Sequence, residues 1–323
     1  MDERENIRED SPAEEGIGKT GRGKKILLAA VIFIAAIAAA VLYFIASHLP
    51  PRGYSDYTVQ KEQYFVEYSD EYDYGEVLTI EYPYLTGVEE EMQKQLNTLM
   101  YDAAMDRTNY WHFFPNDEVK KFQREYFTFF CSDVNCDMAF HSQYLLSMNF
   151  EEIYCTGNPV WMTNLTERTL TVDLLTGQTY ELSDIFEINR DFIRLWDRVY
   201  SEEAGEELGD DETIDMLLSW FLKEDAELNE VYQFRPSFYV TEDKNFVIGI
   251  FLDPILEKSI TYEPLYRGFK VEIAAEDLAP FRKESEFWGK YDKSEAAGEV
   301  LPCQEKKENL WLGEGAGIWD WEY

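Results

Sequence analysis

The order of apolar and polar residues separates one continuous apolar run near the N-terminus from a long remainder of short, periodic segments. The run, ILLAAVIFIAAIAAAVLYFIAS, extends from Ile26 to Ser47 and contains 22 residues without a charge. A helix of this length matches a hydrocarbon core about 30 Å thick, whereas a cleaved signal peptide has an apolar stretch of only about 7 to 15 residues. The pattern therefore predicts an uncleaved transmembrane helix over residues 26–47.

The basic residues around this run indicate its orientation. Residues 1–25 contain six of them, four packed against the run, whereas Arg52 and Lys61 are the nearby basic residues beyond it. Cytoplasmic flanks of membrane helices are enriched in Lys and Arg. We therefore expect a single-pass protein of a bacterial cell membrane, with a disordered cytoplasmic tail at residues 1–25 and the bulk of the chain exported.

The first exported segments predict a linker, a strand and a helix. Residues 48–75 are rich in Tyr, Asp and Glu and are expected to form the linker. Residues 77–82 (VLTIEY) alternate as a strand does, and Pro83 is expected to end this strand. Thr86 followed three residues later by Glu89 is a capping-box pattern, which predicts the start of a helix.

The following segments predict three hairpins and two longer helices. The hairpins are expected from alternating runs at residues 126–150, 169–186 and 238–251. Helices are expected after Asn189 and after Asp211. A further strand, leading into a helical turn, is expected at residues 269–281.

These elements define the fold class and the domain boundaries. Strands grouped around a few helices indicate an α+β domain with antiparallel sheets packed with helices, preceded by one transmembrane helix. We expect the N-terminal part of the exported domain at residues 76–187 and its C-terminal part at residues 188–282. The acidic, Trp-rich tail at residues 283–323 is expected to be loosely ordered.

All four cysteines lie on the predicted exported side, where disulfides persist. Cys131 and Cys136 flank four residues between two strand-like runs, so they are expected to face each other across a hairpin end. Cys155 and Cys303 would then tether the tail to the domain. Four cysteines allow three connectivities, and a structural zinc site, the alternative, is a poor match for this spacing.

The net charge of the chain limits the classes of partner that it could bind. Against 64 acidic residues there are 29 basic ones, so the formal net charge is -35, which excludes a protein that grips nucleic-acid phosphates. Residues 1–25 carry six basic and seven acidic residues, so almost all of the net charge is exported. Such a surface attracts cationic proteins or metal ions, although acidic surfaces also serve solubility alone.

The sequence contains no recognisable catalytic or metal-binding motif. The three histidines, His48, His112 and His141, have no suitably spaced partners, and no nucleophile or phosphate-binding motif occurs. The acidic clusters at residues 70–73 and 210–212 lack the spacing of a calcium loop, so solvated surfaces are expected there. We therefore expect no catalytic residue, no cofactor and no metal site.

Three stretches of the exported part carry a resemblance to a known family. They are VLTIEYPYLTG at residues 77–87, TVDLLTGQTYELSDIF at residues 171–186, and FYVTEDKNFVIGIF with FKVEIAAEDL further on. Together they resemble an exported family of unknown function, found in the extracellular part of anti-sigma-V type lysozyme sensors and in front of some peptidoglycan deacetylase domains. The positions that match the family motifs are Tyr82, Pro83, Gly87, Asp173, Leu174, Thr176, Gly177, Leu182, Asp184 and Phe186.

The resemblance implies an α+β domain that faces the cell wall and, in the sensor members, binds lysozyme. Lysozyme is cationic, which agrees with the negative charge of the exported part. Residues 1–25 are too short and too Gly-rich for the sigma-binding helices of the sensors, and no deacetylase domain is expected after Phe281. The lysozyme-contacting positions of the sensors fall outside the motifs matched here.

We therefore expect a membrane-anchored, non-enzymatic binding or sensor module at the cell wall. Its expected partners are the lipid bilayer, through residues 26–47, and lysozyme or peptidoglycan. Two alternatives stay open. One is an accessory subunit that docks a membrane partner, and the other is a wall-polymer hydrolase with a carboxylate pair, whose separation in space a sequence does not reveal.

Overall fold

The computed structural model describes residues 53–69, 75–126, 130–156, 162–225, 227, 232–254 and 268–303. The chain divides into two compact units, Met1–Arg52 and Gly53–Tyr323. The predicted transmembrane helix and the predicted cytoplasmic tail belong to the first unit and lie outside the described residues. Within the described ranges, no helix combines the length and the apolar character needed to cross a membrane.

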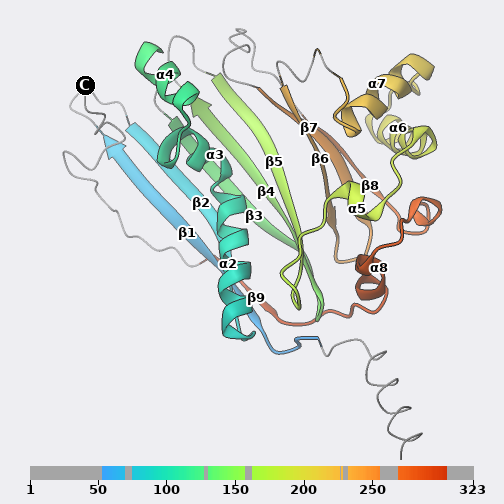
Figure 1. The fold of residues 1–323 in the computed structure, drawn as a ribbon, viewed down its shortest axis with the longest axis horizontal. Coiled ribbons are helices and arrows are strands. Elements are labelled where there is room, and N and C mark those ends of the chain that lie inside the picture. The colour runs from blue at the N-terminus through green and yellow to red at the C-terminus, as the bar shows by residue number, and fades with distance from the viewer. Residues whose placement is uncertain are drawn as a thin grey trace, which may run out of the picture. The chain divides into compact units, whose positions relative to one another are not determined.

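Six strands of the second unit form one sheet, in the order β5-β4-β3-β2-β1-β9 (Figure 1). They are β1 (Thr58–Ser69), β2 (Gly75–Thr86), β3 (Phe130–His141), β4 (Leu145–Thr156), β5 (Met162–Asp173) and β9 (Glu299–Leu301). The α+β class is confirmed, but the sheet is mixed, because β2 pairs with β3 and β1 with β9 in parallel. A long helical crossover between β2 and β3 makes the first of these parallel pairs possible.

A second, antiparallel sheet has the order β6-β7-β8, with β6 at Tyr232–Val240, β7 at Phe246–Pro254 and β8 at Gly268–Ile273. The α-helices are α2 (Glu90–Ala104), α3 (Asp106–Thr108), α4 (Asp117–Tyr126), α5 (Leu182–Ile185), α6 (Arg190–Ala204), α7 (Asp211–Phe221) and α8 (Glu286–Tyr291). A π-helical turn, η1, spans Asn109–Phe113, and a 3-10 turn, η3, spans Ala279–Phe281. Figure 1 shows α2 across one face of the six-stranded sheet, and α6 and α7 beside the three-stranded sheet.

The first hydrophobic core lies between α2 and the six-stranded sheet. From Ser132 to Asp137, residues of β3 alternate between buried and exposed, because successive side chains of a strand point to opposite faces. On α2, Leu96 and Met100 are four positions apart, so both face the sheet and both are fully buried. Complete burial of a side chain of this size contributes about 1.5–3 kcal/mol.

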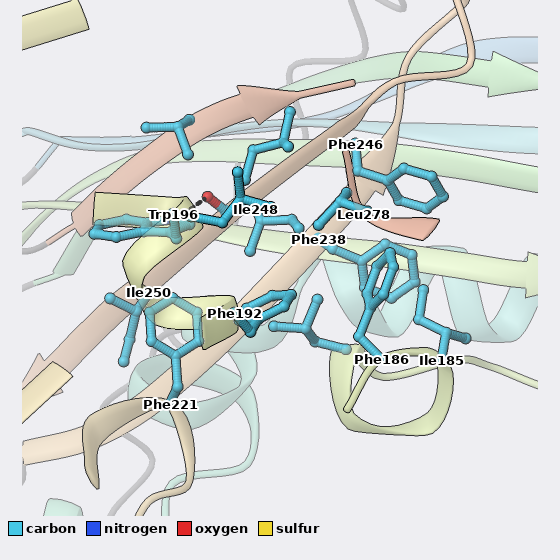
Figure 2. Packing of buried hydrophobic residues seen from close by; sticks show 14 of the residues in the cluster. Ile185, Phe186, Phe192, Trp196, Phe221, Phe238, Phe246, Ile248, Ile250 and Leu278 are labelled. Atoms are coloured by element: carbon cyan, nitrogen blue, oxygen red, sulfur yellow. Dashed lines mark hydrogen bonds between the residues drawn. The ribbon is translucent and has the colours of Figure 1, made fainter. Parts of the chain in front are cut away.

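The second hydrophobic core is rich in aromatic residues and joins the three-stranded sheet to α5, α6, α7 and α8 (Figure 2). The ring centroid of Phe246 lies 5.3 Å from that of Phe186 and 5.7 Å from that of Trp288. These edge-to-face and tilted pairs are arrangements that aromatic rings prefer. Trp196 of α6 is also fully buried, and its Nε1 donates to the carbonyl oxygen of Ile248 at 2.9 Å, so its polar atom is satisfied inside the core.

The domain begins earlier than the sequence indicated. The predicted linker at residues 48–75 contains β1, which pairs with β2 along its whole length. Pro83 does not end the second strand, because β2 continues to Thr86 and Pro83 is the register partner of Lys61. The ladder between β2 and β3 covers residues 78–80. Pro83 lies beyond that ladder, so its missing N–H removes no bond on that side.

The first long helix also begins later than predicted. Glu89, not Thr86, is the N-cap of α2, since its side chain accepts a hydrogen bond from the N–H of Met92 at 3.2 Å. Gly87 has a φ of +90°, a conformation that glycine adopts at little cost. The chain can therefore turn sharply between β2 and α2.

The first predicted hairpin exists, but its turn lies further along the chain. Because β3 continues to His141 and β4 begins at Leu145, residues 142–144 form the turn. The hydroxyl of Ser142 accepts a hydrogen bond from the N–H of Leu145 at 2.9 Å and holds this turn. The segment between Cys131 and Cys136, predicted as the hairpin end, is part of a continuous strand.

The later elements follow the sequence more closely. The second predicted hairpin is reduced to a single bridge, between Val172 and Thr179, because the chain then enters α5. β6 and β7 confirm the third hairpin. The two predicted helices are α6 and α7. Asn189 is the N-cap of α6, and the N-cap of α7 is Asp210, one residue before the predicted Asp211.

The first part of the predicted tail belongs to the folded domain. It contains α8, where Phe287 is fully buried and Trp288 and Tyr291 are 8% and 3% exposed. It also contains β9, which adds to the edge of the sheet at β1. Residues 304–323, with the remaining tryptophans, lie outside the described residues.

Candidate binding groove

A groove opens between the three-stranded sheet and the face of the six-stranded sheet that points away from α2. At one end the two sheets touch, because the N–H of Val240 donates to the hydroxyl of Ser147 at 2.9 Å. Further along β4 and β5 the sheets enclose a cavity of about 550 Å³. The cavity is lined by Asn135, Glu151, Glu152, Ile153, Leu165, Thr166, Glu167, Tyr200, Phe251, Gly268, Phe269 and Lys270.

Two aliphatic side chains form an exposed apolar pair in this groove. Ile153 of β4 and Leu165 of β5 are register partners and remain 48% and 45% exposed. Phe251 and Phe269 line the opposite wall. A Cβ on Gly268 would fall 1.9 Å from a ring carbon of Phe251, so glycine allows that ring to lie against the backbone. Apolar walls of this kind are typical of binding sites.

Three charged side chains converge between these walls. The Nζ of Lys270 lies 3.0 Å from a carboxylate oxygen of Glu151 and also contacts the carboxylate of Glu167. The two glutamates are register partners on β4 and β5. The side chain of Glu167 is 12% exposed and that of Glu151 is 58% exposed. One carboxylate is therefore held inside the protein, and the other is accessible to a partner.

Burial and the neighbouring charges set the protonation of this cluster. Burial raises the pKa of Glu167 against the opposing effect of Lys270, and the nearby Glu151 adds to the rise. Burial on its own lowers the pKa of Lys270, but the hydrogen bonds and charge of the glutamates outweigh burial and raise it. The ammonium group therefore stays charged at neutral pH.

A buried ion pair lies on the opposite face of the same strands. The Nη1 of Arg168 lies 2.5 Å from Oε2 of Glu152, and Ser132 donates to the other carboxylate oxygen at 2.5 Å. Arg168 also donates to the carbonyl oxygens of Ala103 and Ala104, at 2.8 and 3.2 Å. Carbonyls at the end of a helix lack helical partners. This network therefore connects β3, β4 and β5 to the C-terminal end of α2.

A second charged cluster lies beside that helix end. A carboxylate oxygen of Asp106 lies 3.0 Å from Nε of Arg107 and 3.1 Å from Nη1 of Arg235 on β6. Burial on its own raises the pKa of Asp106, but the charges of Arg107, Arg235 and Arg168 outweigh it and lower the pKa to about 2. The carboxylate thus connects α3 to the three-stranded sheet in its ionised form.

We expect the Asp106 cluster to make stability depend on acid pH. A carboxyl whose pKa is about 2 in the folded state and ordinary in the unfolded state stabilises the protein above about pH 4. That contribution is lost as the pH falls towards about 2. Urea denaturation at a series of pH values should show a larger loss of unfolding free energy for the wild type than for Asp106→Asn. Equal losses in the two proteins would contradict these ion pairs.

The D-L-x-T-G part of the family motif forms a turn braced by α8. Asp173, at the end of β5, is fully buried, and its carboxylate contacts the Nζ of Lys290. The same carboxylate accepts hydrogen bonds from the N–H groups of Leu175 and Thr176, at 2.7 and 3.3 Å. Gly177 completes the turn with a φ of +69°. These positions are explained by the local fold.

The remaining motif positions are also structural. Leu174, Leu182 and Phe186 are buried, and Asp184 accepts from the N–H of Glu181 at 2.8 Å in the capping box of α5.

The Tyr-Pro-x-x-x-Gly positions support β2 and the turn after it. The hydroxyl of Tyr82 donates to Glu62 at 3.0 Å, and its ring packs edge to face on Tyr101 at 5.1 Å. Pro83 is buried, and Gly87 makes the turn to α2. All ten motif positions lie in the described residues, and none of the ten lines the groove.

The four cysteines, all in the described part of the chain, form no disulfide in the structure. Cys131 and Cys136 lie on one strand, about 16 Å apart at roughly 3.3 Å per residue, and their odd spacing turns them to opposite faces. Cys155 on β4 and Cys303 after β9 are separated by three strands. Both predicted pairs are therefore wrong. Burial raises the pKa of the Cys136 thiol to about 12, which makes it unreactive at neutral pH.

The histidines occupy separate places. His48 lies outside the described residues, and His112 lies in η1, where burial lowers its pKa to about 4 and keeps it neutral at physiological pH. The Nδ1 of His141 lies 2.7 Å from the carbonyl oxygen of Ala297. In the ranges that the structure describes, no three His, Cys, Asp or Glu side chains are grouped to hold a metal ion.

The acidic cluster at residues 210–212 belongs to the start of α7. Asp210 caps the helix by accepting from the N–H of Thr213 at 2.9 Å, and Asp211 forms an ion pair with Arg190 at 3.2 Å. The cluster at residues 70–73 lies outside the described residues.

A second cavity, of about 520 Å³, lies between β6 and the segment that enters α5. Its lining includes Arg235, which is already engaged by Asp106. The first groove instead combines an accessible carboxylate with exposed apolar side chains. We therefore take the first groove as the candidate binding site.

Comparison with known proteins gives a distant structural similarity. No family model and no curated protein matches the chain. A DUF3298 family member from Bacteroides fragilis has a TM-score of 0.47 at 12% identity, over 74% of this chain and 99% of that one. A DUF3298 family protein from Pseudomonas aeruginosa has a TM-score of 0.36 at 11% identity, over 71% of this chain and 95% of that one. These neighbours are domain-of-unknown-function proteins, and at this similarity we infer nothing from them about partners.

Sequence reasoning did not find the groove residues. The available signal was the strand alternation, which places Ile153 on the same face as Glu151, and Leu165 on the same face as Glu167. An apolar residue among polar ones on an outward face marks an exposed patch. Lys270 is 103 residues from Glu167, and no local pattern connects the two.

Proposed function

We propose that the protein is a membrane-anchored, non-enzymatic binding module at the bacterial cell wall, whose groove binds a cationic protein such as lysozyme. One observation carries this proposal: the exposed pair Ile153 and Leu165 lies beside the accessible carboxylate of Glu151. Such an arrangement is complementary to a protein surface on which Lys or Arg side chains flank apolar residues.

The charge of the exported part supports a cationic partner. Nearly all of the net charge of -35 lies beyond residues 1–25, and such a field raises the rate of encounter with a positively charged protein. Apolar contacts in the groove then supply affinity that salt does not screen. The anchor at residues 26–47 and the resemblance to lysozyme sensors belong to the same proposal.

The carboxylates of the groove favour recognition over hydrolysis. A glycosidase pair needs one carboxyl that is protonated as a general acid, usually about 5–9.5 Å from the second carboxylate. Glu151 and Glu167 instead contact the same ammonium group of Lys270. That shared contact holds the two carboxylates against one cation, in a fixed arrangement that suits a binding surface.

Titration of the full-length protein in detergent micelles with lysozyme tests the proposal. We expect saturable binding that persists at about 0.15 M salt. Leu165→Asp should weaken it about tenfold or more, because it places a charge in the apolar contact. Leu208→Asp is the matched control, since Leu208 is 63% exposed and does not line the groove. Its affinity should stay within about twofold of wild type.

The partner control is an unrelated protein of similar positive charge. Equal, salt-sensitive binding of both proteins would contradict a specific interface. If the protein binds peptidoglycan fragments instead of lysozyme, and Leu165→Asp weakens that binding, the groove is the binding site but its partner is peptidoglycan. If Leu165→Asp leaves the affinity for lysozyme unchanged, the groove is not the binding site.

A further inference from the structure

We infer that Cys131 and Cys155 form a cross-strand thiol pair that closes to a disulfide in an oxidising compartment. The two residues are register partners in the antiparallel ladder between β3 and β4. Directly opposed residues in such a ladder have Cα atoms about 4.5 or 5.5 Å apart. This separation falls inside the range of about 4.4–6.8 Å that a disulfide spans.

The other two cysteines are not register partners of either member of this pair. Cys136 is on the same strand as Cys131 but points to the opposite face, where it is 2% exposed in the first core. Cys303 follows β9, at the far edge of the sheet from β4. The strand order therefore opposes Cys131 to Cys155 and to neither of the other two cysteines.

The pair is accessible and lies on the face of the sheet that carries the groove. Cys131 and Cys155 are both half-buried, so a small thiol reagent can reach them. Strand alternation places Cys155 on the same face as Ile153, two residues earlier on β4. A disulfide here would fix β3 to β4 beside the groove. The inference rests on strand register and does not depend on the proposed binding function.

Closure requires an oxidant, which we assign to the class of thiol–disulfide exchange partners. The thiolate of one cysteine attacks the oxidant disulfide, forms a mixed disulfide and releases one thiolate. The thiolate of the other cysteine then attacks the protein sulfur of the mixed disulfide and releases the second. The protons of the two cysteines end on the two released thiolates, and two electrons pass from the protein to the oxidant.

Incubation of the full-length protein with oxidised glutathione tests this pairing. After acid quenching and denaturation, the remaining thiols are labelled with N-ethylmaleimide, and peptides are mapped by mass spectrometry without reduction. We expect labels on Cys136 and Cys303, and a linked peptide pair that joins Cys131 to Cys155 and is two hydrogen atoms lighter than the separate peptides. Four labelled thiols, a link through Cys136 or Cys303, or stable glutathione adducts on both strands would overturn the inference.

Two single substitutions test whether the disulfide requires Cys155 and is independent of Cys303. Cys155→Ser should abolish the linked peptide and leave Cys131 either labelled or carrying one glutathione. Cys303→Ser is the matched control, because it removes a half-buried cysteine outside the pair. The linked peptide should persist in that variant. Loss of the link in Cys303→Ser would also overturn the inference.

Discussion

Replacement of Arg168 by Met is expected to lower the free energy of unfolding by about 3–5 kcal/mol. Met replaces the aliphatic part of the Arg side chain but not its guanidinium group. Glu152, which is 1% exposed, then keeps the hydroxyl of Ser132 as its remaining hydrogen-bond donor in the network. The carbonyl oxygens of Ala103 and Ala104 lose their donors as well. Urea denaturation followed by tryptophan fluorescence measures the change.

Two further variants test the reason for that loss. Arg168→Met combined with Glu152→Leu removes both charges and should recover most of the stability, because buried ion pairs are often replaceable by apolar residues. Arg194→Met is the surface control, since Arg194 is 50% exposed beside Asp191 and Asp211. Its urea denaturation midpoint should stay close to that of the wild type, because exposed ion pairs contribute little to stability. A surface variant as costly as Arg168→Met would contradict the role of burial.

The elements that the sequence predicted well are those with local signals. Asn189 and Asp210 cap α6 and α7 through contacts within three residues, so their effect is visible in the sequence. The hairpin of β6 and β7 has a short connection between two alternating runs. In these cases local preference and tertiary structure agree.

The elements that were missed depend on partners far away in the chain. The residues between Cys131 and Cys136 include Asp133 and Asn135, which favour turns. They form a strand because β3 is flanked by β2 and β4, and tertiary context overrides the weak local preference. β1 and α8 were likewise hidden in acidic sequence, although α8 buries Phe287 in the second core.

The family motif and the groove differ in the same way, because the motif is local in sequence and the groove is not. A motif such as the one around Asp173 is visible because its residues are close in sequence, and here it describes a turn. The groove is assembled from β4, β5, β7, β8 and α6, so its charged centre depends on Lys270 reaching two other strands. The proximity of these three side chains follows from the order of the strands, which local sequence patterns do not reveal.

Asp173→Ala is expected to destabilise the protein by about 3–5 kcal/mol. The substitution leaves Lys290, which is 15% exposed, with Glu286 at 3.6 Å as its nearby carboxylate. It also removes the acceptor of the N–H groups of Leu175 and Thr176. Both losses fall in the turn that connects β5 to the segment entering α5, so urea denaturation should show a large decrease in the midpoint.

Asp173→Asn separates the two contributions. The amide oxygen can still accept from the N–H groups of the turn, but the charge opposite Lys290 is lost, so we expect roughly half of the destabilisation of Asp173→Ala. A double-mutant cycle of Asp173→Asn with Lys290→Met should give a coupling energy of about 1–3 kcal/mol. A coupling energy near zero would show that the hydrogen bonds of the turn alone account for the stability that Asp173 contributes. Equal losses in the Asn and Ala variants would instead assign its whole contribution to the ion pair with α8.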